Sequence, residues 1–259
     1  MKTEERNRLS RRSFIRQATA MAAFTVVPRH VLGGPGRISP SEKLNIACIG
    51  VGGMGASDVG QVSSENIVAL CDVDFKHADA TFKQYPNVKK YRDFRIMLDK
   101  EGDNIDAVTV STPDNIHAVA AMAAIKMGKH VYCQKPLCHD IFEVRQLTEA
   151  ARKHEVMTQM GIQIHAEEAV KRVVEIIKSG LIGKVQRVDI FSSKNWGGGT
   201  RPVESEQIPE MLDWDLWLGP APWRPYHSTY LPGNWRRWWD FGTGTLGDMG
   251  CHIIDPVWW

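Results

Sequence analysis

Three residues of this sequence have the types and the spacing for acid–base chemistry. Asp248 and His252 are four residues apart in a stretch with a helical pattern, so they share one helix face. A carboxylate beside an imidazole can orient the ring and stabilise its protonated form. Lys135 lies between an apolar run and Pro136, where a buried strand gives way to a turn. Taken alone, such a pair is more often a surface contact and such a lysine a solvated charge, so a catalytic role for these three residues depends on the motifs that accompany them.

A glycine-rich turn marks a second candidate site. Residues 44–49 predict a strand that runs directly into the sequence GVGGMG at positions 50–55, and a helical pattern follows. In such a G-x-G-x-x-G turn the glycines allow a tight turn, close approach of a pyrophosphate and close packing of the helix on the strand. The helix N-terminus offers its N–H groups to the phosphates. The residues expected to bind a dinucleotide here are Gly50, Gly52, Gly53, Met54 and Gly55.

Asp72 indicates which dinucleotide binds. It ends the strand predicted at 66–70 and follows Gly50 by 22 residues, where an acid binds the adenosine ribose 2′-hydroxyl and repels a 2′-phosphate. This favours NAD, while Lys76 nearby leaves NADP open; the alternative role of Asp72 is a helix N-cap. Ligands of such sheets bind at the carboxyl ends of the strands. On that ground we add to the cofactor site Thr112, Pro113, His117 and Lys135.

The elements that must position these residues alternate along the chain. Further strands are predicted at 105–110, 130–133 and 156–162, and helices at 116–127 and 141–154. Alternating strands and helices predict a parallel, doubly wound sheet. We therefore expect an α/β protein with an N-terminal Rossmann domain over residues 44–163.

The second half differs in composition, because all nine tryptophans follow residue 195. A helix is predicted at 166–179 and a strand at 185–192, so we expect residues 164–259 to form an α+β substrate domain with a mostly antiparallel sheet. Aromatic rings beside charges, as in the sequence WRRWW at 235–239, suit polyhydroxylated rings. Packing of long loops explains the tryptophans equally well, and Arg236 and Arg237 could instead contact another subunit.

The N-terminus predicts export. Residues 1–30 hold seven Lys or Arg and two acids, and the twin-arginine string at 10–16 precedes an apolar stretch at 18–27. This three-part pattern is typical of a Tat signal peptide; an amphipathic helix or a basic tail is the alternative. Residues 31–43 are rich in Gly, Pro and Ser and indicate a linker. We expect the Tat machinery as a partner and a periplasmic or other extracytoplasmic location.

Composition excludes several classes of protein. A chain that is 43% hydrophobic and 24% charged is typical of a folded globular protein. Residues 31–259 hold 25 bases and 28 acids, so we expect no nucleic-acid partner. No apolar run is long enough to span a bilayer. Cys48, Cys71 and Cys133 lie in apolar runs without C-x-x-C spacing, which predicts buried thiols, no disulfide framework and no metal site.

The motifs and their order along the chain resemble those of the Gfo/Idh/MocA family of sugar and cyclitol oxidoreductases. The resemblance rests on the glycine turn, Asp72, the sequence TPDNIH at 112–117, the sequence GKHVYCQKP at 128–136 and the glycine-rich helix with its Asp/His pair. It departs from the family at Gln134, where Glu is usual. A neutral amide lacks the charge that would hold Lys135 protonated, which puts an acid–base role of Lys135 in doubt.

The resemblance implies hydride transfer between a secondary alcohol of a sugar, cyclitol or glycoside and NAD(P). His252 would take the hydroxyl proton, Lys135 would stabilise charge on that oxygen, and Asp248 would orient His252 or bind a neighbouring hydroxyl. An exported enzyme must carry its cofactor, so we expect tightly retained NAD. The alternatives are a redox-neutral NAD-dependent glycosidase of the same fold, a non-enzymatic sugar or dinucleotide sensor and, weakest, a zinc enzyme.

The resemblance also bears on length. Family members continue beyond the catalytic helix with a largely antiparallel sheet, whereas this chain stops at Trp259 inside that helix. One strand, at 185–192, cannot bury the helix and the tryptophans. We therefore expect the 259 residues to be a truncated form with an incomplete second domain, and the full-length protein to be a homo-oligomer.

Overall fold

The computed structural model describes residue 39 and residues 42–259. The chain divides into two units, residues 1–43 and 44–259, and all elements below belong to the second unit. The export signal and nearly all of the linker expected before residue 44 lie outside the described residues.

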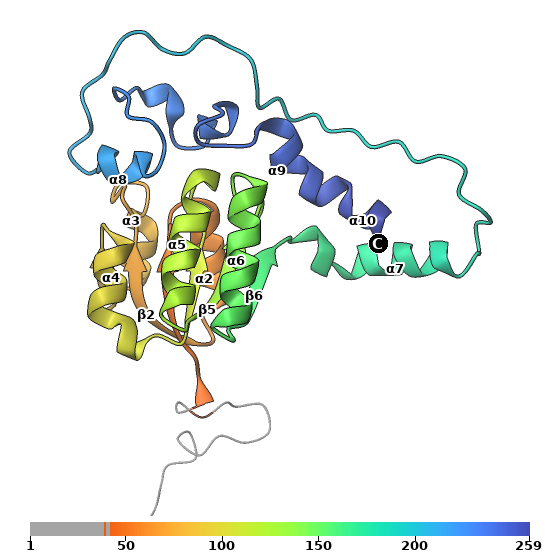
Figure 1. Ribbon diagram of the computed structural model, residues 1–259, viewed down its shortest axis with the longest axis horizontal. Coiled ribbons are helices and arrows are strands. Elements are labelled where there is room, and N and C mark those ends of the chain that lie inside the picture. Colours follow the sequence, from red (N-terminus) through yellow and green to blue (C-terminus); the bar gives the residue numbers. More distant parts are fainter. Residues whose placement is uncertain (1–38, 40–41) are drawn as a thin grey trace, which may run out of the picture. The chain divides into compact units, whose positions relative to one another are not determined.

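A six-stranded, fully parallel sheet forms the centre of residues 44–163, as the alternation of elements predicts (Figure 1). The strands are β1 (Asn45–Ile49), β2 (Asn66–Cys71), β3 (Lys89–Tyr91), β4 (Ala107–Val110), β5 (His130–Gln134) and β6 (Thr158–Gly161). Their order across the sheet is β3-β2-β1-β4-β5-β6. The chain runs outward from β1 to β3 and then crosses to β4, so β1 and β4 enclose the switch point at which ligands of such sheets bind.

Helices cover both faces of this sheet. Figure 1 shows α4, α5 and α6 side by side over one face, and α2 and α3 pack on the other. The bounds are α2 (Met54–Gln61), α3 (Asp79–Gln84), α4 (Phe94–Glu101), α5 (Asp114–Lys126) and α6 (Ile141–Lys153). Side chains of β1 alternate between the two faces: Ala47 and Ile49 join the core under α4–α6, and Ile46 and Cys48 join the core under α2 and α3.

Local sequence explains where the helices of the Rossmann domain begin. The side chain of Asp93 caps α4 by accepting a hydrogen bond from the Arg95 amide. At α6, Asp140 and Glu143 form a reciprocal capping box. These caps fix the helices that lead back to each following strand.

Residues 164–259 contain helices and irregular segments, and none of these described residues belongs to a strand. The helices are α7 (Glu168–Lys178), α8 (Trp214–Leu218), α9 (Gly244–Ile253) and α10 (Asp255–Trp258), with short 3-10 turns between them. The strand predicted at 185–192 is therefore wrong, and the expected antiparallel sheet is not formed in this part of the chain. A strand needs a hydrogen-bonded neighbour, which this segment lacks; its Phe191 is 87% exposed.

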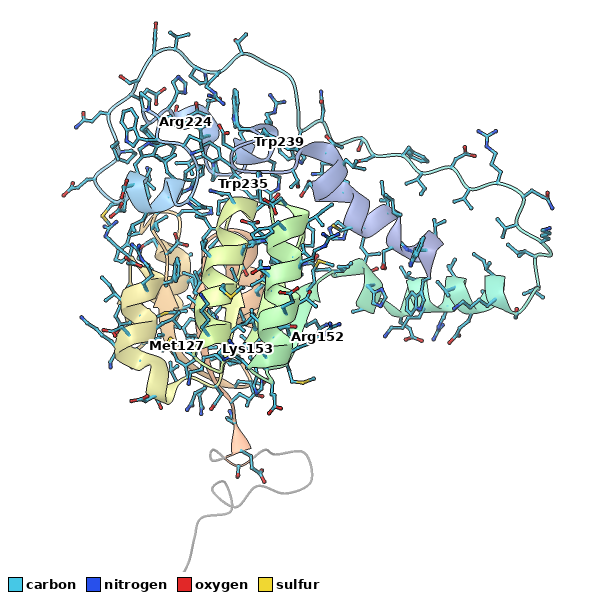
Figure 2. All side chains as sticks on the ribbon, viewed as in Figure 1. Met127, Arg152, Lys153, Arg224, Trp235 and Trp239 are labelled. Carbon is cyan, nitrogen blue, oxygen red and sulfur yellow. The ribbon has the colours of Figure 1, made fainter. Side chains whose placement is uncertain are left out.

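An aromatic cluster packs the irregular part of the second half. Trp214 and Trp217 stack with ring centroids 4.8 Å apart, and Tyr230 and Phe241 pack against them. Trp235 is also buried in this cluster. Figure 2 shows Trp235 at one end of α5 and α6 and Met127 and Lys153 at the opposite end. The cluster therefore lies over the end of the sheet where the candidate ligand site is expected.

Residues 211–219, which we call the strap, attach the second half to the Rossmann domain by backbone contacts. The Asp213 amide donates to the Val73 carbonyl at 2.9 Å, and the Phe75 amide donates to the Met211 carbonyl at 3.0 Å. Between them, Asp74 and Leu212 form an isolated antiparallel bridge. The strap is thus fixed beside the loop that follows β2.

All five cysteines are free thiols, and Cys48, Cys71 and Cys133 are buried as their apolar surroundings predict. Burial raises the pKa of Cys48 to about 11, so this thiol is unreactive at neutral pH. In the described part of the chain, no helix combines the length and the apolarity that crossing a bilayer requires.

Candidate active site

One cleft of about 910 Å³ collects most of the residues that the sequence marks as chemical. Its walls come from the carboxyl ends of the strands, from the strap and from α9. The predicted site residues that line it are Gly50, Gly52, Gly53, Met54, Asp72, Thr112, Pro113, Lys135, Asp248 and His252. Its volume is in the range of pockets that bind cofactors and small molecules.

The glycine turn has the geometry of a phosphate cradle. Gly50 has a φ of +75°, and a Cβ there would lie 2.7 Å from the Ser111 carbonyl oxygen. A Cβ on Gly55 would overlap the carbonyl oxygen of Gly50. No side chain caps the N-terminus of α2, which leaves that end to a phosphate. These features fit a dinucleotide, and the ring of His77 lies against Gly52 and lines the same cleft.

Asp72 closes this turn from the end of β2. Its Oδ2 accepts hydrogen bonds from the amides of Val51 and Gly52 at 2.8 and 3.1 Å. Burial raises its pKa although these amides favour the carboxylate. The helix that follows begins at Asp79, so Asp72 is not an N-cap and that alternative is excluded. Lys76 does not line the cleft, but Arg92 and Arg95 do, so Asp72 shares this end of the cleft with two guanidinium groups.

His117 lies beneath the cleft rather than in its wall. It is 1% exposed, and its Nδ1 and Nε2 face the carbonyl oxygens of Pro136 and Thr112 at 2.8 and 2.9 Å. The ring therefore joins the turn after β4 to the turn that carries Lys135. The structure thus gives His117 a supporting place behind the cofactor turn, where the sequence suggests a direct contact.

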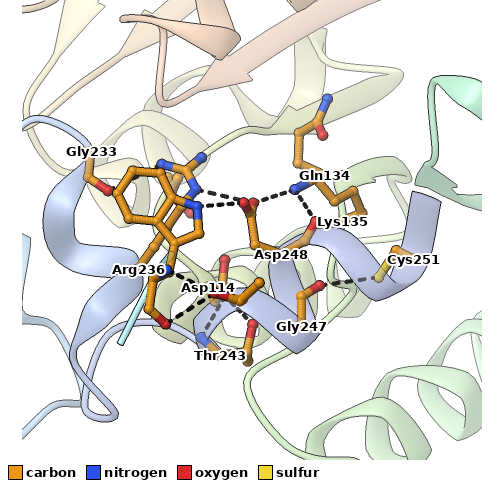
Figure 3. Close-up of polar contacts among 12 residues, drawn as sticks. Asp114, Gln134, Lys135, Gly233, Arg236, Thr243, Gly247, Asp248 and Cys251 are labelled. Carbon is orange, nitrogen blue, oxygen red and sulfur yellow. Dashed lines mark hydrogen bonds and ion pairs between the residues drawn. The ribbon is translucent and has the colours of Figure 1, made fainter. Parts of the chain in front are cut away.

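Lys135 and Asp248 meet across the cleft (Figure 3). The Lys135 Nζ donates to the Asp248 Oδ1 at 2.6 Å and to its backbone oxygen at 2.9 Å. Burial works against ionisation of Asp248, but the hydrogen bond and charge of Lys135, with help from Arg236 and Trp196, hold its pKa below the usual value. The pair is therefore an ammonium and a carboxylate.

His252 lines the cleft one helical turn after Asp248, but no hydrogen bond joins the two. Asp248 is engaged by Lys135, Trp196 and Arg236, so the expected orientation of His252 by Asp248 is not what the structure shows. The His252 Nδ1 is buried and has no hydrogen-bond partner among the described residues. Burial and the charge of Lys135 lower the pKa of His252, which favours the neutral ring, a proton acceptor.

Gln134 does not contact the Lys135 ammonium at all. Its Nε2 donates to both oxygens of the buried Asp58 carboxylate, at 3.0 and 2.9 Å. A glutamate at this position would bring a second carboxylate against Asp58. Asp248, not residue 134, supplies the negative charge for Lys135, so the departure from Glu does not remove the counter-ion.

Three further side chains, which were not among the predicted site residues, complete the site. Trp196 donates its Nε1–H to the Asp248 Oδ2 at 2.7 Å, and Arg236 donates from Nε to the Oδ1 at 3.2 Å. Asp114 is buried and accepts hydrogen bonds from the Thr243 amide and hydroxyl at 3.1 and 2.8 Å, which anchors the start of α9. None of these contacts has a local signal, because the partners are 12 to 129 residues apart.

Comparison with known proteins agrees with this geometry. The model of an oxidoreductase family with an NAD-binding Rossmann fold matches residues 44–162, and the model of its C-terminal alpha/beta domain matches residues 166–259.

The chain belongs to the Gfo/Idh/MocA oxidoreductase family.

Relatives in this family include dehydrogenases and a glycosyl hydrolase. The inositol 2-dehydrogenase of Salmonella typhimurium is 27% identical over 54% of this chain and 43% of its own length. A glycosyl hydrolase family 109 protein of Saccharopolyspora erythraea is 28% identical over 83% of this chain and 44% of its own. The crystal structure of myo-inositol 2-dehydrogenase from Lactobacillus plantarum is 26% identical with a TM-score of 0.51, over 55% of this chain and 43% of that one. The chain thus spans less than half the length of these Gfo/Idh/MocA proteins.

Membership makes NAD the cofactor class of the Rossmann domain. The glycine turn, the uncapped start of α2 and Asp72 are the residues of this Gfo/Idh/MocA chain that fit the dinucleotide. His165 does not line the cleft; it pairs with Asp255 at 2.7 Å and stacks on Trp259.

Proposed function

We propose that this chain carries the cofactor site and the catalytic residues of an NAD-dependent oxidoreductase that acts on a secondary alcohol of a sugar, cyclitol or glycoside. The observation that carries the proposal is the contact between Lys135 and Asp248, beside His252, in the cleft that also contains the glycine turn. A cation, a neutral base and a phosphate cradle in one cleft are the groups that such a reaction needs.

The donors of Lys135 suggest how the alcohol is held. An ammonium has three N–H donors, and Asp248 accepts from two of them through Oδ1 and its backbone oxygen. The third donor remains for the substrate oxygen, where it stabilises developing negative charge. The neutral ring of His252 takes the hydroxyl proton. The bound nicotinamide supplies the hydride acceptor, and the protein's own work is to orient the alcohol and to move this proton.

Arg236 and Trp196 keep this arrangement in place. Trp196 donates to the Asp248 Oδ2 that Lys135 leaves, and Arg236 shares Oδ1 with Lys135. The Arg236 guanidinium lies 4.1 Å from the centroid of the Trp235 ring. Asp248 is therefore a positioning residue for Lys135. Aromatic rings that line this part of the cleft, Trp196, Trp217 and Trp235, suit the apolar faces of a sugar or cyclitol.

A screen of sugars, cyclitols and glycosides tests the proposal. The purified chain is mixed with NAD⁺ and each compound, and reduction of the nicotinamide is followed by absorbance. We expect at least one polyol to reduce it in wild type and not in a His252→Ala variant that still binds NAD⁺. Binding without reduction of the nicotinamide by any compound would favour the sensor alternative.

A redox-neutral glycosidase is the second candidate. The glycosyl hydrolase relative aligns with 83% of this chain, including most of the second half, whereas the inositol 2-dehydrogenase aligns with 54%. Such an enzyme would oxidise, eliminate and then re-reduce, so it would release the aglycone of a nitrophenyl glycoside without net NADH. A dehydrogenase would accumulate NADH and release no aglycone.

We further propose that the cofactor is tightly retained and that the twin-arginine segment exports the folded protein. The strap supports retention, because its Leu216, Trp217 and Gly219 line the cleft and its backbone is hydrogen bonded to the loop after β2. An exported enzyme must carry its cofactor with it, so the cofactor would have to stay bound after export. Denaturing the exported protein should release stoichiometric dinucleotide, and replacing Arg11 and Arg12 by Lys should keep the protein in the cytoplasm.

A further inference from the structure

A chain of polar contacts, which we call the amide relay, runs under one end of the cleft. Gln134 donates from Nε2 to the Asp58 carboxylate, and its Oε1 accepts a hydrogen bond from the Gln163 Nε2 at 3.0 Å. Asp58 and Gln134 are 6% and 5% exposed, and both Gln134 and Gln163 line the cleft. The relay therefore connects a buried carboxylate to the ligand site.

Asp58 gives the relay a direction. A carboxylate offers only acceptors, so Gln134 must turn its NH₂ group toward Asp58 and its oxygen toward Gln163. Ser111 adds a hydroxyl donor to the same carboxylate at 2.6 Å. Gln163 must then turn its own NH₂ group inward, which directs its Oε1 away from the relay. That oxygen accepts no hydrogen bond from any described residue.

Topology places Gln163 at the nicotinamide end of the cleft. Asp72 on β2 marks the adenosine side, and the glycine turn after β1 marks the diphosphate. The other half of the dinucleotide then extends over β4 and β5. Gln163 follows β6, which pairs with β5, and it contacts the residue next to Lys135. The group at that end of an NAD molecule is the carboxamide of the nicotinamide.

We propose that Gln163 is a specificity residue whose Oε1 accepts a hydrogen bond from the carboxamide N–H of the nicotinamide. Asp58 is a positioning residue that fixes the polarity of Gln163 through Gln134. The proposal rests on the proposed function, since it requires NAD in the cleft. A fixed acceptor favours a ligand with a donor at this point and disfavours one that has only acceptors.

The test compares NAD⁺ with its 3-acetylpyridine analogue, whose methyl ketone replaces the carboxamide and removes both N–H donors. Dissociation constants are measured by calorimetry on the whole chain, freed of bound dinucleotide and without substrate. We expect wild type to bind NAD⁺ on the order of fivefold more tightly, as one net hydrogen bond gives. Gln163→Met keeps the length of the side chain without the acceptor and should bind both compounds equally.

Asp58→Asn is the sharper variant because residue 58 does not line the cleft. The new amide can donate to Gln134 as well as accept from it, so the direction of the relay is no longer fixed and Gln163 can present its NH₂ group to the ligand. We expect this variant to show a weaker preference for NAD⁺. Gln159→Met, an exposed position on β6, is the matched control and should keep the preference.

The outcomes separate the two levels of the proposal. A Gln163→Met variant that discriminates as wild type does, or a wild type that does not discriminate, overturns the role of Gln163. An Asp58→Asn variant that keeps the preference overturns the role of Asp58. A wild type that binds neither compound overturns the proposed function itself, and the assignment of Gln163 with it.

Discussion

The Nζ of Lys135 lies 2.6 Å from the Oδ1 of Asp248, a residue 113 positions later in the chain. The two side chains are 12% and 11% exposed, so the ion pair is largely shielded from solvent. It joins the turn after β5 to α9, and thus joins the cofactor-binding half of the chain to the helix that carries His252. Pairs of this kind are costly to break, because the remaining charge stays buried without a partner.

Substitution of either partner should lower turnover strongly while NAD⁺ binding survives. For Lys135→Met and Asp248→Asn we expect turnover to fall about 10²- to 10⁴-fold, the range for removal of groups that act on the transferred proton or on developing charge. Steady-state kinetics and NAD⁺ calorimetry measure the two effects. Lys89→Met breaks an ion pair of similar length with Glu101 outside the cleft and is the matched control. Near-normal turnover in Lys135→Met would contradict the assignment.

His252 should titrate below 6.5, its ordinary pKa, because burial and Lys135 disfavour the charged ring. Alcohol oxidation needs the neutral ring, so the rate should fall only below this lowered pKa. Lys135→Met should move the titration upward, and Asp248→Asn should move it downward, since Asp248 favours the charged ring. Imidazole NMR signals, assigned by comparison with His252→Gln, follow both shifts. If Lys135→Met and Asp248→Asn shifted the His252 pKa equally and in the same direction, this electrostatic explanation would be ruled out.

Gln134→Glu should destabilise the fold at neutral pH. It would place a carboxylate against that of Asp58, whose pKa burial already raises. We expect the free energy of unfolding to fall by about 1–3 kcal/mol at pH 7, measured by urea denaturation. The loss should shrink as pH falls, since protonation of one carboxyl restores a donor. Adding Asp58→Asn should rescue most of it; a loss independent of residue 58 would argue against this contact.

His117→Phe should weaken both the fold and cofactor binding. The change leaves the carbonyl oxygens of Thr112 and Pro136 without their partner in the core, which costs about 2–4 kcal/mol of unfolding free energy. Because His117 supports the turn that lines the cleft, NAD⁺ affinity should fall too. His154→Phe, at a ring that makes no hydrogen bond in the described structure, serves as control. An unchanged NAD⁺ affinity would confine His117 to a structural role.

The Rossmann half could be predicted from sequence because its signals are local. The glycine turn, the apolar strands and the helix caps each act within a few residues, and the parallel sheet follows from their alternation. The short strand β3 was missed, since three residues with two lysines carry no apolar pattern.

The second half could be predicted less well, because its contacts join distant residues. The pattern at 185–192 predicts a strand, but pairing depends on a neighbour that the local sequence cannot reveal. The i,i+4 spacing places Asp248 and His252 on one helix face. It does not reveal that Lys135 and Trp196, and not His252, donate hydrogen bonds to the Asp248 carboxylate. Gln163 likewise has no motif; only its contact with Gln134 singles it out.

The backbone pairing of the strap with the loop after β2 has a consequence for exchange. The amides of Phe75 and Asp213 join the strap to the loop after β2, and residues of both segments line the cleft. We therefore expect local opening of this pairing to speed the release of a bound dinucleotide. The residence time of the cofactor would then depend on backbone hydrogen bonds within the chain that do not involve the cofactor.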